Sequence, residues 1–450
     1  MRERKINRRN FLGTASAAGT ASLLAGSGRA FGGAVPEGEK LAIDGGTPVR
    51  ETPLGSGMYG PQFYDEVEQR ELLDVLASKR PFRHSAGDSK VLLFEKEYAE
   101  HLGANHALGL TSGTTALMTA MAALEVGPGD EVILPAWTWY SDYDAVIHAG
   151  ALPVFTEIDE SFNMDPEDIE HRITPRTKVI APSHLQGCPA DIEPIIEIAR
   201  KHNLRVLEDC AQCVGGRYQD QYLSTLGDIG IFSFQESKTI TAGEGGALVT
   251  NDPEVFERAV RFHDVGILRV HSVALEGGTL ETFPSTNFRM SEFTGAVLRG
   301  QLQKLEAIVG ANRAHARAVR EGIADLPGIR LRKQSDPDGD VGEMVFLILD
   351  TREQARQFMR ALNAEGISAR PPGGSAVLPA VPHIENKVTL HPDWPSFNSP
   401  QGRAIQYGRE SCPRTIDILQ RAVGVRMNPS YTEQDVQDII RAIRKVYVTI

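Results

Sequence analysis

The sequence predicts an α/β protein with a large domain built on a mostly parallel sheet and a smaller C-terminal α+β domain. Three observations support this fold class. Short apolar runs alternate with helical stretches between residues 106 and 250, as in parallel sheets that helices cover on both faces. A long helical stretch near 290–323 then leads into a second, shorter set of strands and helices. The length of 450 residues also exceeds that of most single domains.

Seven apolar runs are expected to form the large sheet. They are HALGL at 106–110, EVILPA at 131–136, ALPVFTEID at 151–159, TKVIAPSH at 177–184, LRVLED at 204–209, DIGIFSF at 228–234 and GALVTND at 246–252. Helical patterns at 114–126, 141–149 and 191–202 separate several of them. Parallel sheets bind ligands beyond the carboxyl ends of their strands. The residues that follow each run are therefore the candidates for function.

Beyond residue 323, MVFLILD, REQARQFMRALNAEG and the final TEQDVQDIIRAIRKV indicate the smaller domain. Residues 372–404 are rich in Pro, Gly, Ser and His, lack periodicity, and are expected to form a long loop. We divide the chain into an N-terminal arm at 35–75, a large domain at 76–310 and a small domain at 311–450.

Residues 1–34 differ from the rest of the chain. Five Lys or Arg residues occur within residues 2–9, and the apolar stretch that follows is shorter than the roughly 20 residues of a membrane span. NRRNFLG, with Arg8 and Arg9, resembles a twin-arginine export signal. We expect a signal peptide at 1–34, export to the periplasm or medium, and no stable membrane anchor. The alternative is a disordered basic tail on a cytoplasmic protein.

Composition narrows the possible partners. A net charge of −12 argues against nucleic acid, which needs a basic surface. Four cysteines are too few for a disulfide framework. Cys210 and Cys213 have the spacing of a redox motif, but small buried packing residues explain them equally well. The 12 histidines are scattered, and we expect no metal site.

The segment TSGTTAL is a candidate anion site. Ser112, Gly113 and Thr114 lie between a strand end and a helix start. Free N–H groups and the positive end of a helix dipole favour an anion there. An ordinary helix cap is the alternative.

Acidic and aromatic residues follow two other strands. Glu208 and Asp209 end the run LRVLED, so one of these carboxylates should point into the site. Trp137 and Trp139 follow EVILPA, where a flat ring would cover a planar ligand. Packing in the core is the alternative for the tryptophans.

A lysine follows the strand DIGIFSF. Ser233 ends this strand, and Lys238 comes five residues later. Gly243, Gly245 and Gly246 allow the backbone to turn closely around the amine. A phosphate cradle, an acid, a flat ring and a lysine together suit a planar aromatic aldehyde. A lysine forms a Schiff base with such a group, and a pyridinium nitrogen needs a carboxylate partner. This combination predicts pyridoxal 5′-phosphate.

The sequence resembles the sugar aminotransferases of the family named after the DegT, DnrJ, EryC1 and StrS proteins. The resemblance runs from about residue 41 to residue 445. It is carried by LAIDGGTPVR, FEKEYAEHLGANHALGLTSGTTAL, GPGDEVILPAWTW, AGALPVFTEID, SHLQGCPADI, VLEDCAQCVGGRY, LGDIGIFSFQESKTITAGEGGALVTND, NFRMSEFTGAVLRGQL and CPRTIDIL. It implies the pyridoxal-phosphate-dependent transferase fold type I, the fold of aspartate aminotransferase.

The resemblance also assigns roles around the cofactor ring. Lys238 would form the Schiff base and later move the proton between the substrate Cα and the cofactor. Asp209 would pair with the ring nitrogen, Gln212 would hydrogen-bond the 3-hydroxyl group, and Trp139 would stack on the ring.

Further residues are implied at the phosphate and the substrate. Gly113, Thr114 and Ser233 would hold the phosphate. Asn287, in TNFRM, would reach the phosphate bound by a neighbouring subunit, which implies a homodimer with shared active sites. His184 would face the substrate.

The implied function is a pyridoxal-phosphate-dependent aminotransferase. It would move an amino group from glutamate or glutamine to a keto sugar or keto cyclitol by a ping-pong mechanism. One alternative is a sugar dehydratase, but those relatives carry His where Lys238 stands. The other is an exported binding protein that keeps the fold without turnover. An export signal departs from the family pattern, whose enzymes use nucleotide-linked sugars in the cytoplasm.

Overall fold

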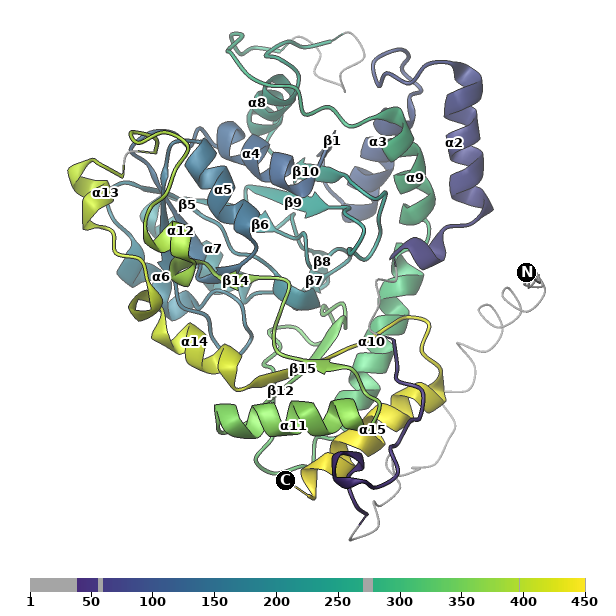
Figure 1. Cartoon of the computed structure of the whole chain (residues 1–450). Helices are drawn as coiled ribbons and strands as arrows, with labels where there is room; N and C mark the ends of the chain where they lie inside the picture. The colour runs from purple at the N-terminus through teal and green to yellow at the C-terminus, as the bar shows by residue number, and fades with distance from the viewer. Residues whose placement is uncertain (1–38, 56–59, 270–277, 396, 450) are drawn as a thin grey trace.

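The computed structural model describes residues 39–55, 60–269, 278–395 and 397–449. The predicted twin-arginine signal lies outside these residues. A large domain with a seven-stranded sheet and a smaller domain with a four-stranded sheet lie next to each other (Figure 1). No helix of the described residues is long and apolar enough to cross a membrane.

The large sheet contains the seven predicted strands, and it is mostly parallel. Only β10 runs antiparallel to its two neighbours within the sheet. The spatial order is β1 (His106–Leu110), β10 (Gly246–Thr250), β9 (Ile229–Ser233), β6 (Arg205–Asp209), β5 (Thr177–Ile180), β2 (Glu131–Pro135) and β4 (Leu152–Thr156). This confirms the predicted α/β fold class.

Helices cover both faces of this sheet because its strands are apolar on both faces. Ala107 and Ile133 belong to one buried cluster, and their neighbours Leu108 and Val132 belong to another. Successive side chains of a strand point to opposite faces, so the two clusters are the two faces. One face is covered by α3 (Lys90–Leu102) and α7 (Ile192–His202); the other by α4 (Gly113–Ala123), α5 (Tyr140–His148) and α8 (Pro253–His263).

The stretch 290–323 is two helices rather than the single long one expected. The helix α9 (Glu292–Leu302) packs on α2 (Glu66–Ser78) and α3, and α10 (Leu305–Gly322) leads to the small domain. The break has a tertiary cause. The Lys304 amine donates to the Glu68 carboxylate at 2.6 Å and to the Phe63 carbonyl at 2.5 Å. These contacts anchor the turn between the two helices.

The small domain combines an antiparallel sheet with three helices. Its cluster of buried side chains is separate from those of the large sheet. The elements are β11 (Arg330–Leu331), β12 (Met344–Ile348), β15 (Ala422–Arg426) and β13 (Ala369–Arg370), in this spatial order, with α10, α11 (Arg352–Ala364) and α15 (Glu433–Tyr447).

Most of the segment 372–404 is irregular, as expected, but it crosses back to the large domain. Its strand β14 (Ala376–Val377) pairs with β3 (Trp137–Thr138). Leu378 and Ile384 are buried in a cluster of the large sheet. The short helices α12 (Pro382–Glu385), α13 (Pro400–Ala404) and α14 (Pro413–Gln420) follow. The predicted domain ranges stay predictions. The crossing segment packs on the large sheet although it lies within the predicted range of the small domain, 311–450.

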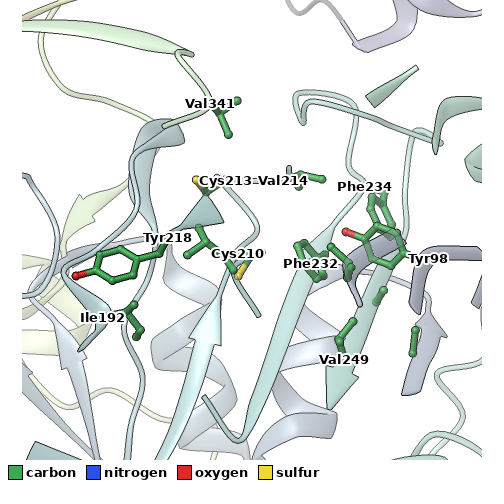
Figure 2. Packing of buried hydrophobic residues seen from close by; sticks show 14 of the residues in the cluster. Tyr98, Ile192, Cys210, Cys213, Val214, Tyr218, Phe232, Phe234, Val249 and Val341 are labelled. Carbon is green, nitrogen blue, oxygen red and sulfur yellow. The ribbon is translucent and has the colours of Figure 1, made fainter. Parts of the chain in front are cut away.

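Cys210 and Cys213 are packing residues in this structure. Both are fully buried free thiols in a hydrophobic cluster of the large sheet (Figure 2). Burial raises the pKa of each thiol well above its usual value, which keeps both in the unreactive protonated form.

Candidate active site

A cavity of about 180 Å³ lies beyond the carboxyl ends of β6 and β9. It combines residues that follow large-domain strands with residues of the small domain. Its lining is Gln186, Ala211, Gln212, Ser237, Lys238, Thr239, Glu343, Arg370, Gly373, Gly374 and Arg426. The cavity therefore lies at the sheet edge where ligands were expected.

Lys238 brings an amine with a lowered pKa to this cavity. Burial lowers the pKa of Lys238, although the carboxylates of Asp209 and Glu343 act in the opposite direction. Among the residues that the structure describes, the amine has no hydrogen-bond or ion-pair partner. The backbone around it turns through Gly243, at φ +81°. The amine is therefore available for chemistry.

Asp209 ends β6, and its carboxylate is close enough to Lys238 for each to affect the pKa of the other. Its Oδ1 accepts a hydrogen bond of 2.8 Å from the Ala211 N–H. Burial raises the pKa of the carboxyl, while the Ala211 N–H and the Lys238 charge oppose the shift. The neighbouring Glu208 instead accepts from the backbone of Ser224 and Gly227, at 3.0 and 2.7 Å. It braces a loop.

Gly113 and Ser233 form a narrow cradle at the start of α4. A Cβ on Gly113 would lie 2.7 Å from the Ser233 Cβ, closer than atoms tolerate. The N–H groups of Gly113 and Thr114 donate to no acceptor within the described residues. The Thr114 hydroxyl lies 2.6 Å from that of Ser141. Two unpaired N–H groups at a helix start, with hydroxyls beside them, suit an anion.

Gln212 spans the cavity between the two domains. Its Oε1 accepts a 2.8 Å hydrogen bond from Gln186, and its Nε2 donates to the Ser375 hydroxyl at 3.1 Å. Gln186 was not predicted from the sequence. It lies in a left-handed turn with φ +52°, which the buried Arg332 supports by donating to the Gln186 and Leu185 carbonyls.

The two tryptophans have different environments. Trp137 is 2% exposed and packs edge-on against Phe162, so the core alternative holds for this residue. Trp139 immediately precedes α5 and is 50% exposed. Trp139 is not among the residues that line the cavity, so its stacking role stays a prediction.

His184 lies inside the protein rather than on the cavity lining. Its Nε2 is 3.2 Å from Glu208 Oε2, and its Nδ1 accepts a 2.9 Å hydrogen bond from the Ala190 N–H. Ligand atoms of His184, Glu208 and Cys210 lie within 4.8 Å of one another. The ring nitrogens and the Glu208 oxygens are already engaged, so we assign this cluster to structural support. The expected substrate contact of His184 gains no support from its position.

Asn287 is exposed and does not line the cavity within its own chain. Its Oδ1 accepts a 3.3 Å hydrogen bond from the Arg289 N–H. The segment runs beside the phosphate cradle, because the Thr111 N–H donates to the Phe288 carbonyl at 3.1 Å.

Three charged residues of the small domain were missed from the sequence. Arg426 pairs with Glu343 at 2.9 Å. Arg370 is partly buried, and its Nε is buried without an acceptor among the described residues. Burial and the charge of Arg426 lower the pKa of Arg370. On the cavity lining, the two arginines outnumber the single carboxylate of Glu343.

The residues present fit pyridoxal 5′-phosphate. The cradle between Gly113 and Ser233 leaves room for no side chain, but its N–H groups suit phosphate oxygens. The amine of Lys238 lies in the same site as the Asp209 carboxylate, and each affects the pKa of the other. A pyridine nitrogen and an aldehyde need these two groups.

Comparison with known proteins supports this fit. Residues 64–377 match the model of the DegT/DnrJ/EryC1/StrS aminotransferase family. A UDP-N-acetyl-3-dehydro-alpha-D-glucosamine 3-aminotransferase of Acidithiobacillus ferrooxidans is 36% identical over 359 residues, covering 78% of this chain and 87% of the relative.

Two further proteins are similar over a greater length. A putative L-glutamine:3-amino-2,3-dideoxy-scyllo-inosose aminotransferase of Micromonospora echinospora is 30% identical over 91% of this chain and 97% of the relative. The crystal structure of 3-amino-5-hydroxybenzoic acid synthase superposes with a TM-score of 0.73 at 27% identity, covering 88% of this chain and 99% of that chain. The chain therefore belongs to the DegT/DnrJ/EryC1/StrS aminotransferase family and is a pyridoxal 5′-phosphate-dependent aminotransferase.

Proposed function

We propose that the enzyme moves an amino group from glutamate or glutamine to a keto sugar or keto cyclitol in two half-reactions. The observation that carries this proposal is the unpaired Lys238 amine in a cavity that also contains Arg370 and Arg426. Both donors carry a carboxylate, and the similar proteins include aminotransferases of a sugar nucleotide and of a cyclitol. A binding protein without turnover would not need this amine.

The environment of Arg370 favours an amino donor that carries a carboxylate. Arg426 already has a carboxylate partner in Glu343, whereas Arg370 forms no ion pair within the described residues. Guanidinium groups bind carboxylates with paired hydrogen bonds. A donor carboxylate at Arg370 would supply the missing partner.

The proton is moved by Lys238 in this proposal. When bound, pyridoxal phosphate acts as an electron sink that stabilises negative charge at the carbon losing its proton. Lys238 Nζ takes the proton from the donor Cα, and its lowered pKa favours the neutral, basic form. The Asp209 carboxylate holds the ring nitrogen, and Gln212 holds the 3-hydroxyl group.

Other residues are proposed to bind the phosphate and the ring of the cofactor. Gly113, Thr114 and Ser233 hold the phosphate, and the exposed face of Trp139 covers the ring. The exposed Asn287 extends to the phosphate bound by a second copy of the chain, which makes the active form a homodimer with shared sites. Dehydratase activity is disfavoured because Lys238 stands where those relatives carry His.

We also propose export by the twin-arginine route, on the basis of Arg8 and Arg9. This route transports folded proteins, so the cofactor would be acquired in the cytoplasm. Replacing both arginines with lysine should retain the protein in the cytoplasm, as measured by fractionation of cells. An unchanged distribution would refute the export proposal and leave the enzymatic proposal intact.

The aminotransfer proposal is tested by following each half-reaction separately. Purified holoenzyme is mixed with glutamate, glutamine or alanine, and conversion of the cofactor to its amine form is followed by absorbance. We expect conversion with glutamate or glutamine. The converted enzyme is then given keto sugars and keto cyclitols, and recovery of the original spectrum identifies the acceptor. No conversion with any amino donor would favour a binding protein.

A further inference from the structure

Asp142 is a buried carboxylate on the first turn of α5, three residues after Trp139. The residue is only 1% exposed. One oxygen, Oδ2, accepts hydrogen bonds from the hydroxyls of Thr138 and, at 3.1 Å, Ser183. The other, Oδ1, has no donor among the described residues. A buried polar atom without a partner is costly, so its surroundings need an explanation.

The neighbour of Asp142 is Asp209. Ser183, whose hydroxyl donates to Asp142 at 3.1 Å, forms an isolated parallel β-bridge with Asp209, and this places the two carboxyl groups close enough for each to affect the pKa of the other. The backbone fixes this arrangement, because the Asp209 N–H donates to the Pro182 carbonyl at 2.9 Å and the next residue, Ser183, binds Asp142. Two carboxylates cannot hydrogen-bond each other unless one of them carries a proton.

The surroundings favour the proton on Asp142. Asp209 accepts from the Ala211 N–H and faces the positive charge of Lys238, with His184 nearby, and these groups stabilise its ionised form. Asp142 is contacted by two neutral hydroxyls. The N-terminus of α5 favours an ionised Asp142, but burial and the adjacent Asp209 raise the pKa of Asp142 well above its usual range.

We propose that Asp142 is a positioning residue that stays protonated at neutral pH and donates its O–H group to Asp209. The pair then carries one negative charge, and that charge is on Asp209. This inference rests on the role proposed above for Asp209 toward the ring nitrogen. A hydrogen bond to a carboxylate stabilises its ionised form. Asp142 thereby keeps Asp209 from taking the proton of the ring nitrogen.

Infrared spectroscopy of the cofactor-free protein tests the protonation directly. The C=O stretch of a protonated carboxyl should be present in the wild type, absent in Asp142→Asn and retained in Asp209→Asn. The control is Asp144→Asn, which makes the same chemical change on the same helix and should leave this band unchanged. A band that persists in Asp142→Asn, or one that is lost in Asp209→Asn, would overturn the proposal. This measurement needs no turnover, so it is independent of the proposed reaction.

Cofactor affinity supplies the second readout. An Asn at position 142 has an oxygen for the two hydroxyls and an N–H group for Asp209, so it mimics a protonated Asp142. Asp142→Asn should keep the wild-type dissociation constant between acidic and neutral pH. Asp142→Ala should weaken binding by about tenfold, as loss of a hydrogen bond to a charged group does. Equal weakening in both variants would show that an ionised Asp142 is needed and would refute the proposal.

Discussion

The backbone of Gly113 lies against the side chain of Ser233. A Cβ built on Gly113 would lie 2.7 Å from the Ser233 Cβ and 3.2 Å from its hydroxyl oxygen. The two residues follow β1 and end β9, the two strands that flank β10. The width of the proposed phosphate cradle is therefore set by the Gly113 backbone on one side and the Ser233 side chain on the other.

Gly113→Ala should lower cofactor affinity by roughly tenfold or more, because the new methyl group displaces Ser233 and the N–H groups beside it. The change is measured by titration of the cofactor-free enzyme. Gly310→Ala, on α10 with open space around its Cα, is the matched control and should bind the cofactor as the wild type does. Unchanged affinity in Gly113→Ala would contradict a phosphate site here.

Lys238→Ala should abolish covalent attachment of the cofactor, and Lys238→Arg should not restore it. Attachment requires the neutral amine. Because burial lowers the pKa of Lys238 from 10.5, its neutral fraction at any pH below 10.5 exceeds that of a free lysine. Borohydride reduction should therefore trap the cofactor on Lys238 at lower pH than it traps the cofactor on Nα-acetyllysine, whose side-chain amine is free. Peptide mass spectrometry locates the reduced adduct, and an adduct elsewhere would contradict the assignment.

Arg370→Met should raise the KM for glutamate or glutamine by roughly tenfold to a hundredfold, the effect expected for a charge-assisted hydrogen-bond pair. The second half-reaction with the keto acceptor should be much less affected, since it involves no donor carboxylate. Arg356→Met, on the exposed surface of α11, is the control. An equal loss in both half-reactions would argue for a general structural role of Arg370.

Mixed dimers test the proposed role of Asn287. Lys238→Ala and Asn287→Ala should each be inactive or severely impaired as homodimers. Mixing them under conditions of subunit exchange should restore activity, because one hybrid site then has both side chains. The recovered rate is compared with that of each variant incubated alone. If mixing yields no activity while hybrid dimers are detected by native mass spectrometry, Asn287 acts within its own chain.

Lys445→Met should destabilise the small domain by about 3–5 kcal/mol, the cost of breaking a buried ion pair from one side. Lys445 and Glu365 are both fully buried, 2.9 Å apart, and Glu365 also accepts from the N–H groups of Ala42 and Val49. Urea unfolding measures the loss. The control is the pair of Lys333, whose side chain is 51% exposed, with Asp159, and Lys333→Met should cost less than about 1 kcal/mol.

The seven strands of the large sheet were predictable because each is an apolar run between helical stretches. The direction of β10 was not, since GALVT is equally apolar on both faces and its pattern contains no information on orientation. The break before Leu305 was also missed. It depends on Lys304 contacting Glu68 and Phe63, which are more than 200 residues away in the sequence.

The site was predictable where residues follow large-domain strands, which is how Asp209, Ser233 and Lys238 were selected. Gln186 was missed because its own backbone adopts the left-handed conformation, which non-glycine residues seldom adopt and which the sequence does not signal at this position. Arg370 was not predicted as a site residue because it ends a strand of the small domain. Only the tertiary fold brings that strand to the cavity that contains Lys238.

The crossing segment has a consequence for substrate size. Residues 370–376 leave β13 at Arg370, border the cavity with Gly373 and Gly374, and are fixed again where Ala376 pairs with Thr138. Both ends of this span are held by strands, so its contour length limits how far the cavity wall stands from Lys238. The number of residues between Arg370 and Ala376 thus limits the size of the acceptor that the cavity can hold. A longer segment would admit bulkier acceptors without moving Lys238 or Asp209.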